Sequence, residues 1–314
     1  MCITFLKIST KSKTRFVLGF NREVEISKPT SPLAQWSEDP NILGGRDLVQ
    51  KGHCLALNKQ TGNIAILTNY SDGPGTKVLG KLSRGDIVRN FVATDFFQKK
   101  GYTRAEAASK YVQEILSERH LYLPFNLIVG NLFELQSGFF VLDFTMKSAQ
   151  RLPEDQYFGM SNSSISSPYT KTVKGVEYLQ SSLTNPSLTE ADSMEAVLKD
   201  TTYHKHHDPY DHEDRIFVLP FKIPSATLVI GTISSTIITL TDDGVLQMTE
   251  KFNQLRGLKE IDLRKQLVQQ DAPNQQKRKL RRAICKINLM RSYAAKGDFP
   301  IDVLTNKFTF NMNS

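Results

Sequence analysis

Short apolar runs of strand type and amphipathic segments of helix type follow one another in blocks along this chain of 314 residues. Strand-like runs come first, a helical block covers about 83–118, and strands then return. A second helical block covers about 171–200, and a last hairpin turns on Asp242-Asp243-Gly244. Helical layers that cover two stacked sheets produce this order of elements. The sequence therefore predicts an α+β fold with sheets inside and helices outside.

The expected strands are short and are bounded by polar turns. The first nine residues alternate in the manner of a strand, and the basic turn 10–15 separates them from an apolar run at 16–20. Further strands are expected at 54–58, 64–69, 125–129, 139–142, 236–240 and 245–249. In the first helical block, Ser83 with Asp86 and Thr103 with Glu106 have the spacing of helix N-terminal caps.

The net charge of +8 is unevenly distributed along the chain. Residues 251–314 carry 14 Lys and Arg against 5 Asp and Glu, which leaves 26 against 27 in residues 1–250. No aromatic interleaving or recognised binding module accompanies the basic residues, so we do not expect a nucleic-acid partner. We expect two parts, a domain over 1–255 and a basic, helical C-terminal extension over 256–314.

The extension contains a basic amphipathic segment at 277–295. Basic residues at 277–279 and 281–282 precede an apolar helical face formed by Leu280, Ala283, Ile284, Ile287 and Met290. Two interpretations remain open for this segment. The apolar stripe packs against the sandwich while the charges face water, or the helix makes a peripheral contact with an anionic membrane surface.

The sequence carries no sign of secretion or of membrane insertion. No run of about 18 apolar residues occurs, so we expect no transmembrane segment. The first nine residues are too short and too interrupted for the apolar region of a signal peptide, and no small-residue cleavage site follows. Three cysteines in so long a chain do not form a disulfide framework. We therefore expect a cytoplasmic protein that is not secreted.

Cys2 has unusual chemical potential because of its position. A small second residue allows aminopeptidases to remove Met1, which would leave a thiol and a free α-amine on one carbon. The α-amine titrates near ~8 and a free thiol near ~8.5, so this single residue would supply both a nucleophile and a base. The alternative is that Cys2 is an ordinary small residue of a buried strand.

One other cluster contains residue types that bind metals. His204, His206, His207 and Asp208 are followed by Asp211-His212-Glu213-Asp214. The cluster contains Pro209, has no cysteine and has no helical spacing that would define a geometry. A solvated loop and a metal or pH-sensitive site both remain open, and we predict no metal site. Cys54 and Cys285 are interpreted as ordinary thiols.

Ten short motifs occur in the order that is typical of the transport and Golgi organization protein 2 family, also called the NRDE family. The chain resembles this family over about residues 1–255. The matching positions are Cys2, Asn21-Arg22, Pro29-Thr30, Trp36, Ile42-Leu43-Gly44-Gly45-Arg46-Asp47, Leu67-Thr68-Asn69-Tyr70, Ser83-Arg84-Gly85, Phe125-Asn126-Leu127, Gly159-Met160-Ser161-Asn162-Ser163 and Gly231-Thr232-Ile233-Ser234-Ser235-Thr236.

The resemblance implies the four-layer α-β-β-α sandwich of the N-terminal nucleophile hydrolases, which include the bile salt hydrolases and penicillin V acylases. By that similarity Cys2 would be nucleophile and base, and Arg22 its electrostatic partner. Asn69 and Asn162 would bind the oxyanion and substrate, a role in which each neutral donor can contribute ~3 kcal/mol. The ligand-binding candidates are Asn21, Arg46, Asp47 and Arg84 from the shared motifs, together with Glu23 and Glu25 next to the Asn21-Arg22 motif.

The sequence departs from the family pattern at three places. The Asn-Arg-Asp-Glu motif is here Asn21-Arg22-Glu23-Val24, with Glu25 as a replacement carboxylate. Gly-Thr-Trp has become Gly52-His53-Cys54, and the arginine before Ser-Ser-Thr is Ile233. Loss of that positive charge weakens the environment for a thiolate or an anionic ligand.

Two functions follow from the resemblance. The first is a role in Golgi organization, protein secretion and lipid or haem handling, through binding of a small hydrophobic or thioester ligand near Cys2. Haem or acyl-CoA is then a ligand, no resident cofactor is expected, and the cytoplasmic protein would associate with Golgi or mitochondria. The alternative is an N-terminal cysteine hydrolase that cleaves an amide or thioester.

Overall fold

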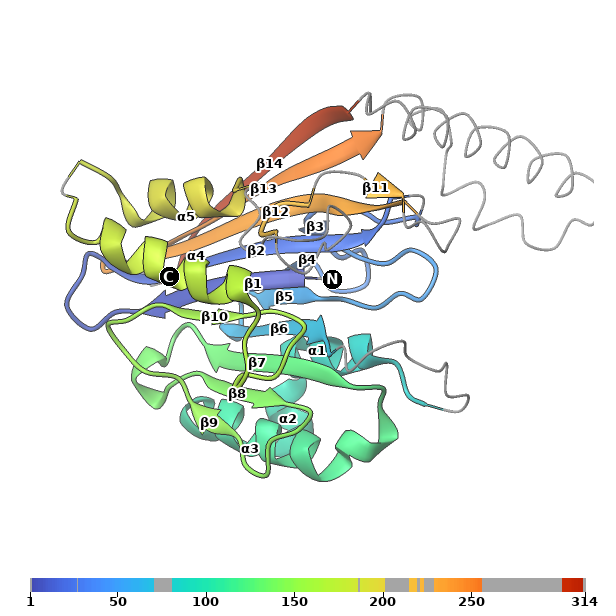
Figure 1. Cartoon of the computed structure of the whole chain (residues 1–314). Coiled ribbons are helices and arrows are strands. Elements are labelled where there is room, and N and C mark those ends of the chain that lie inside the picture. The colour runs from blue at the N-terminus through green and yellow to red at the C-terminus, as the bar shows by residue number, and fades with distance from the viewer. Residues whose placement is uncertain are drawn as a thin grey trace, which may run out of the picture.

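The structure is a computed structural model that describes residues 2–26, 28–70, 81–185, 187–200, 215–218, 221–222, 229–255 and 301–312. The described residues form an α+β fold with two antiparallel seven-stranded sheets. The sheets are stacked, and helices cover the outer face of each (Figure 1). The expected alternation of strand and helix blocks is confirmed.

The first sheet has the strand order β10-β1-β2-β12-β13-β14, and β11 pairs with β12. Its strands are β1 (Cys2–Ile8), β2 (Thr14–Glu25), β10 (Phe158–Met160), β11 (Phe221–Lys222), β12 (Val229–Thr241), β13 (Val245–Leu255) and β14 (Ile301–Asn311). The hairpin between β12 and β13 turns at Gly244, whose φ of 83° is a left-handed conformation that glycine adopts without strain.

The second sheet runs β3-β4-β5-β6-β7-β8-β9 in chain order. Its strands are β3 (Ala34–Gln35), β4 (Ile42–Gly44), β5 (Leu55–Asn58), β6 (Asn63–Asn69), β7 (Phe125–Asn131), β8 (Phe140–Asp143) and β9 (Gln150–Arg151).

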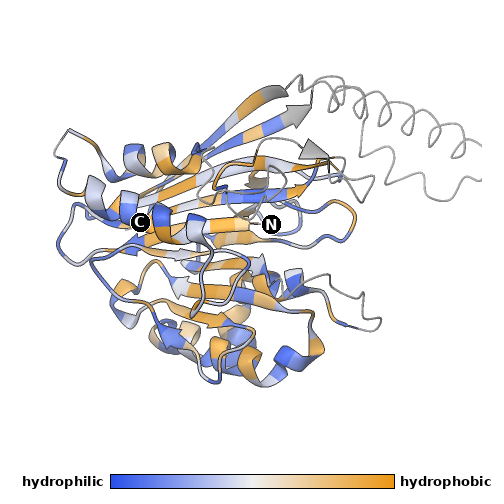
Figure 2. Ribbon diagram, in the orientation of Figure 1, coloured by the Kyte–Doolittle hydropathy of each residue, from blue (hydrophilic) through white to orange (hydrophobic). Residues whose placement is uncertain are grey.

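Helices α1 (Arg84–Val92), α2 (Phe96–Lys100) and α3 (Arg104–Glu118) pack on the second sheet, whereas α4 (Thr170–Ser182) and α5 (Glu190–Leu198) pack on the first. Two short 3-10 turns, η1 (Arg119–Leu121) and η2 (Leu135–Ser137), complete the described helical segments. Figure 2 shows hydrophobic residues along the strands and hydrophilic ones on the outer sides of the helices.

The alternation of side chains along β1 distributes its residues between two cores. Cys2 and Leu6 belong to the core between the sheets, whereas Ile3 and Phe5 belong to the core under α4 and α5. All seven residues of β1 are buried because both faces of this strand are covered. Each fully buried large apolar side chain stabilises the fold by roughly 2–3 kcal/mol.

The prediction that 256–314 is a separate helical extension is corrected for residues 301–311. These residues form β14, which pairs with β13 from Leu255 opposite Ile301 to Val245 opposite Asn311. Phe308 and Phe310 pack against the core between the sheets. The first sheet is therefore completed by a strand that returns from beyond the proposed boundary at 255.

Replacing Phe310 with alanine tests the contribution of β14. Phe310 is partly buried against the core between the sheets and lies 5.4 Å below the Lys59 ammonium. We expect a loss of about 2 kcal/mol of unfolding free energy, below the cost at a fully buried phenylalanine. Thr309→Ala, on the exposed side of the same strand, should change stability by less than about 0.5 kcal/mol in urea unfolding. Equal stability of the two variants would show that β14 does not support the sheet.

Candidate functional site

Cys2 and Arg22 are brought together by the pairing of β1 with β2. They are direct Cα partners across this pair, so both side chains leave the same face of the first sheet, toward the second sheet. Cys2 is 5% exposed and Arg22 is 6% exposed. Arg22 lies opposite Ser234 of β12, directly after an irregularity between Thr232 and Ser234. The sequence prediction that Arg22 accompanies Cys2 is consistent with this geometry.

Asn162 holds the backbone at the start of β1. The Cys2 backbone N–H donates to Asn162 Oδ1 at 2.8 Å, and the Ser161 hydroxyl donates to the Cys2 carbonyl at 2.9 Å. Asn162 Nδ2 donates to the backbone carbonyl of Asn69. The Asn69 residue is itself exposed. Asn162 therefore contacts Cys2 directly, whereas Asn69 contributes its backbone.

Two buried polar residues of the second sheet position the loop that carries Asn162. Asn126 Nδ2 donates to the carbonyls of Ser161 at 2.8 Å and Ser163 at 2.9 Å, and the Thr68 hydroxyl also donates to the Ser161 carbonyl. Asn126 and Thr68 are both completely buried. These positioning residues occur in the shared motifs, but their role cannot be inferred from the motifs alone, because it depends on the loop at Ser161–Ser163 packing against the second sheet.

Cys54 is the main feature of the site that the sequence interpretation missed. It precedes β5 in the second sheet and packs against the core between the sheets, to which Cys2 belongs. The interaction between the two thiols raises the pKa of Cys2 well above its ordinary value, and burial raises it further. The same interaction lowers the pKa of Cys54 to about 6 against the opposing effect of burial. The interpretation of Cys54 as an ordinary thiol, unrelated to Cys2, is therefore corrected.

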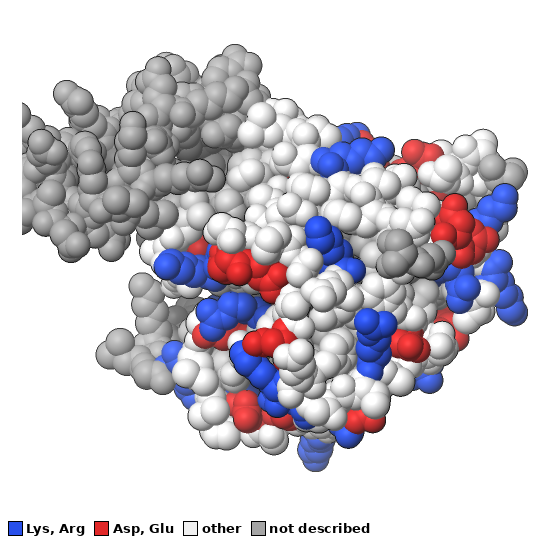
Figure 3. Space-filling model, turned by 180° about the vertical axis from the view of Figure 1, so that it is seen from behind, with Lys and Arg blue, Asp and Glu red and all other residues white. Residues whose placement is uncertain are grey.

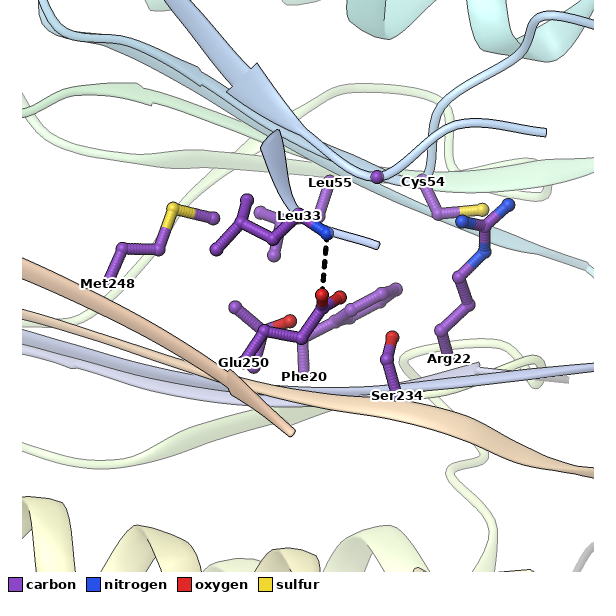
Figure 4. A pocket seen from close by; sticks show the side chains of 10 residues that line it. Phe20, Arg22, Leu33, Cys54, Leu55, Ser234, Met248 and Glu250 are labelled. Carbon is purple, nitrogen blue, oxygen red and sulfur yellow. Dashed lines mark hydrogen bonds between the residues drawn. The ribbon is translucent and has the colours of Figure 1, made fainter. Parts of the chain in front are cut away.

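Two guanidinium groups favour a thiolate at Cys54. The positive charges of Arg22 and Arg84 both act to lower the pKa of Cys54. Arg84 is the first residue of α1, and its Nη1 donates to the Pro124 carbonyl at 2.8 Å. Figure 4 shows the Cys54 sulfur beside the Arg22 guanidinium. The Cys2 thiol therefore keeps its proton at neutral pH, whereas the Cys54 thiol loses its proton near pH 6.

A small cavity of about 10 Å³ lies between the sheets beside these groups (Figure 4). This volume admits about one water molecule. The polar groups that line it are Arg22, Cys54, Ser234, Thr236 and Glu250. Arg22 Nε has no hydrogen-bond partner among the described residues. A side chain at Gly45, which also lines the cavity, would place its Cβ 3.4 Å from Arg22 Nη1 and 3.1 Å from the Ser31 carbonyl.

Glu250 is the acidic group of this cavity. Its carboxylate accepts a hydrogen bond from the Leu33 backbone N–H. Burial raises the pKa of Glu250, whereas this hydrogen bond and the charge of Arg22 lower it. The residue links β13 to the loop before β3. It was not among the residues predicted from the sequence.

Asn21 and Glu23 do not share the side of the sheet that Cys2 occupies. Because side chains alternate along β2, both face the layer of α4 and α5. Asn21 Nδ2 donates to the carbonyls of Leu198 at 2.8 Å and Ile216 at 2.9 Å. The Glu23 carboxylate lies 3.9 Å from the ammonium of Lys171, and both side chains are completely buried. The structure therefore corrects the prediction that these two side chains join the Cys2 site.

Glu23 reaches Cys2 through its main chain. A hydrogen bond from the Glu23 backbone acts to lower the pKa of Cys2. Glu25 lies at the end of β2, opposite Ile230, and is partly exposed. Neither observation places a carboxylate of β2 beside the thiols.

Arg46 and Asp47 support the loop on the other side of the cavity. The Arg46 guanidinium lies 4.9 Å from the Trp36 ring centre and forms an ion pair with Glu38. Asp47 Oδ1 accepts the backbone N–H groups of Val49 and Gln50, each at 2.9 Å. Asp47 thus acts in the turn, whereas Arg46 borders the site through Trp36.

His53 stacks on the same tryptophan. The two rings are 3.9 Å apart at an interplanar angle of 24°, and His53 is buried. Burial and the nearby charge of Arg46 lower the pKa of His53 to about 3. A neutral imidazole therefore lies next to Cys54 in the chain at all physiological pH values.

The predictions about metals and membranes can be compared with the structure over the described residues. Among the described residues, no group of three or more His, Cys, Asp or Glu side chains is arranged to hold a metal ion. None of the described helices is long and apolar enough to cross a membrane. Charges of both signs are interspersed on the face in Figure 3. The 204–214 cluster, the 277–295 segment and Cys285 lie outside the described residues.

We expect acid to destabilise the fold through His53. The unfolded chain binds a proton below pH ~6.5 that folded His53 accepts only near pH 3, so stability is lost as the pH falls through this window. Between pH 6.5 and 5 the loss from this group is about 2 kcal/mol. His53→Phe keeps an aromatic ring on Trp36 and should lack this share of the pH dependence in urea unfolding. The exposed His120→Gln is the control, and an unchanged pH dependence in His53→Phe would contradict the assignment.

The chain is similar to known proteins over most of its length. Residues 1–254 match the model of the family described as Transport and Golgi organisation 2. The Transport and Golgi organization protein 2 homolog of Bos taurus is 24% identical over 270 residues, which span 80% of this chain and 92% of that protein. The Homo sapiens homolog is 25% identical and the Mus musculus homolog 23% identical, each with the same coverage. The chain therefore belongs to the Transport and Golgi organisation 2 family.

Proposed function

We propose that this protein acts in Golgi organisation and protein secretion, and in lipid or haem handling, by binding a small hydrophobic or thioester ligand beside Cys2. The names of its relatives, which mention transport and Golgi organization, support the Golgi part of the proposal. The observation that carries the second part is the Cys2 and Cys54 thiol pair, which lies beside two guanidinium groups and the apolar side chains of the core between the sheets.

An acyl thioester suits this combination of groups. Its acyl chain is apolar, and the phosphates of a coenzyme A portion would be attracted to the partly exposed Arg84 and Arg46. Cys54 could supply a thiolate ligand to the iron of a haem. However, the internal cavity of about 10 Å³ does not hold a macrocycle. We therefore favour a thioester that binds at the rim of the cavity, in a cytoplasmic protein that associates with Golgi or mitochondria.

A second candidate is an N-terminal cysteine hydrolase, and one observation favours it. The Cys2 nitrogen that donates to Asn162 Oδ1 at 2.8 Å becomes a free α-amine when Met1 is removed. That amine would take the thiol proton, and the sulfur would attack the carbonyl carbon of an amide or thioester. The proton would then pass to the leaving group, and water would hydrolyse the acyl-enzyme. The stacked sheets with outer helices agree with the N-terminal nucleophile hydrolase sandwich that this candidate requires.

Binding is favoured over hydrolysis because one expected oxyanion donor is engaged elsewhere and the other belongs to an exposed residue. Asn162 Nδ2 donates to the Asn69 carbonyl, and the Asn69 side chain belongs to an exposed residue. Ile233 also replaces the cation that the family pattern has before Ser-Ser-Thr. These features weaken stabilisation of a tetrahedral intermediate, whereas they leave the thiol pair and Arg84 in place.

Dodecanoyl-CoA is a suitable probe, with free CoA and dodecanoate as references. We expect Arg84→Met to weaken binding about tenfold, because a charge-assisted hydrogen bond contributes about 1.5 kcal/mol. Arg89→Met, which removes an exposed guanidinium from the same helix, should bind as the wild type does. Isothermal titration measures the affinities, and equal affinity of all three proteins would contradict the binding site.

Turnover separates the two candidates. Intact mass shows whether Met1 is removed, and repeated release of free CoA that is lost in Cys2→Ala would support the hydrolase. Stoichiometric binding without release, in a chain that has lost Met1, would support the binding function. A retained Met1 would exclude the hydrolase that uses the Cys2 α-amine.

A further inference from the structure

Two cysteines from opposite sheets meet beside a buried cation. Cys2 begins β1 of the first sheet and is the Cα partner of Arg22. Cys54 precedes β5 of the second sheet, and its sulfur lies beside the Arg22 guanidinium (Figure 4). Cys2 belongs to the core between the sheets, and Cys54 packs against that core. We propose that Cys54 and Cys2 form an oxidation site, in which a hydroperoxide oxidises Cys54 and Cys2 then closes a reversible disulfide across the two sheets. This inference concerns oxidation of the thiols and does not depend on the ligand proposed above.

The surroundings of the two thiols suggest the order of events. Cys54 is partly exposed and has Arg22 beside its sulfur, which favours the nucleophilic thiolate. Cys2 is 5% exposed, and its pKa is raised, so it retains its proton. Cys54 is therefore the first sulfur to react and Cys2 is the resolving thiol.

The cavity suggests the class of oxidant. Its volume of about 10 Å³ and its lining by Cys54, Arg22 and Ser234 suit a molecule close to water in size that exchanges hydrogen bonds. Arg22 Nε is unpartnered among the described residues, so it is available to such a molecule. Hydrogen peroxide meets these requirements, whereas a bulky disulfide such as oxidised glutathione does not.

The disulfide forms in two steps. The Cys54 thiolate attacks one oxygen of hydrogen peroxide, the O–O bond breaks, and the departing hydroxide takes a proton to become water. Cys54 is then a sulfenic acid. The Cys2 sulfur displaces the sulfenic hydroxyl, its proton leaves with that group as a second water, and the S–S bond forms. An added dithiol returns both thiols by exchange.

The disulfide also has a consequence for the site. It would join β1 to the second sheet next to Arg22 and remove both thiols from any ligand. Oxidation would thus switch the site off in this chain.

The test uses the full chain with Cys285→Ser, so that the third thiol does not compete. After treatment with equimolar hydrogen peroxide, we expect an intact mass lower by two hydrogens and a tryptic peptide pair that links Cys2 to Cys54. Dithiothreitol should restore the original mass. With oxidised glutathione in place of peroxide, we expect a reaction at least about tenfold slower, because the site is partly closed to it.

Variants separate the proposal from general thiol oxidation. Cys54→Ser should leave Cys2 largely unmodified under the same conditions. Arg22→Met should slow disulfide formation about tenfold, as expected if the thiolate fraction falls by one pKa unit, while Arg89→Met reacts as the parent does. Circular dichroism checks that each variant is folded, and Arg22→Lys, which keeps a cation, should recover part of the rate.

Three results would overturn the proposal. One is addition of oxygen to the cysteines without a Cys2 to Cys54 linked peptide in the folded protein. Another is oxidation of Cys2 at the parent rate in folded Cys54→Ser. The third is a linked peptide that forms at the same rate in the parent and in folded Arg22→Met.

Discussion

The buried guanidinium of Arg22 is the charge around which the centre of this molecule is arranged. A cation in a core between two sheets is costly unless anionic or strongly polar groups lie close to it. Polar groups from both sides of this core lie close to the Arg22 guanidinium. Cys54 comes from the second sheet's side, and Ser234 and Glu250 come from the first sheet. Cys2 lies directly opposite Arg22 on the neighbouring strand, so its thiol enters the same small polar region.

This arrangement depends on the way β1 and β2 are covered. Both strands lie in the middle of the first sheet, with the second sheet on one face and α4 and α5 on the other. Alternate residues therefore enter two different environments. Cys2 and Arg22 enter the polar region between the sheets, whereas Asn21 and Glu23 tie the sheet to the helical layer through Leu198 and Lys171. The stretch from Asn21 to Glu23 thus contributes both to the Cys2 site, through Arg22, and to the packing of the helical layer, through Asn21 and Glu23.

Local sequence patterns predicted which segments form strands and helices better than they predicted which strands pair with one another. The order of strands and helices and the turn at Gly244 could be predicted because they depend on neighbouring residues. The strand β14 was missed because its partner β13 ends 46 residues earlier in the chain, and the basic segment between them suggested a helix. The pairing of Cys54 with Cys2 was missed for a similar reason, since it depends on how two sheets stack.

The residues of the candidate site were also predicted only in part. The resemblance pointed to Cys2, Arg22 and Asn162, and the structure brings these three together. The prediction that Asn21 and Glu23 join the Cys2 site was wrong, although both residues are neighbours of Arg22 in the sequence. Neighbouring side chains in a strand face opposite sides of the sheet, so these two point away from Cys2. Glu250 gave no signal in the sequence, because its importance comes from burial beside Arg22.

Arg22 and the thiol pair maintain a thiolate between the sheets near neutral pH. The ultraviolet absorbance of thiolate as a function of pH, in a chain with Cys285→Ser, detects this thiolate. We expect one thiolate to appear with a midpoint near pH 6, to be lost in Cys54→Ser and to appear at higher pH in Arg22→Met. If both thiols instead titrate near the ordinary value of ~8.5, and Arg22→Met does not change the curve, then Arg22 does not maintain a thiolate between the sheets.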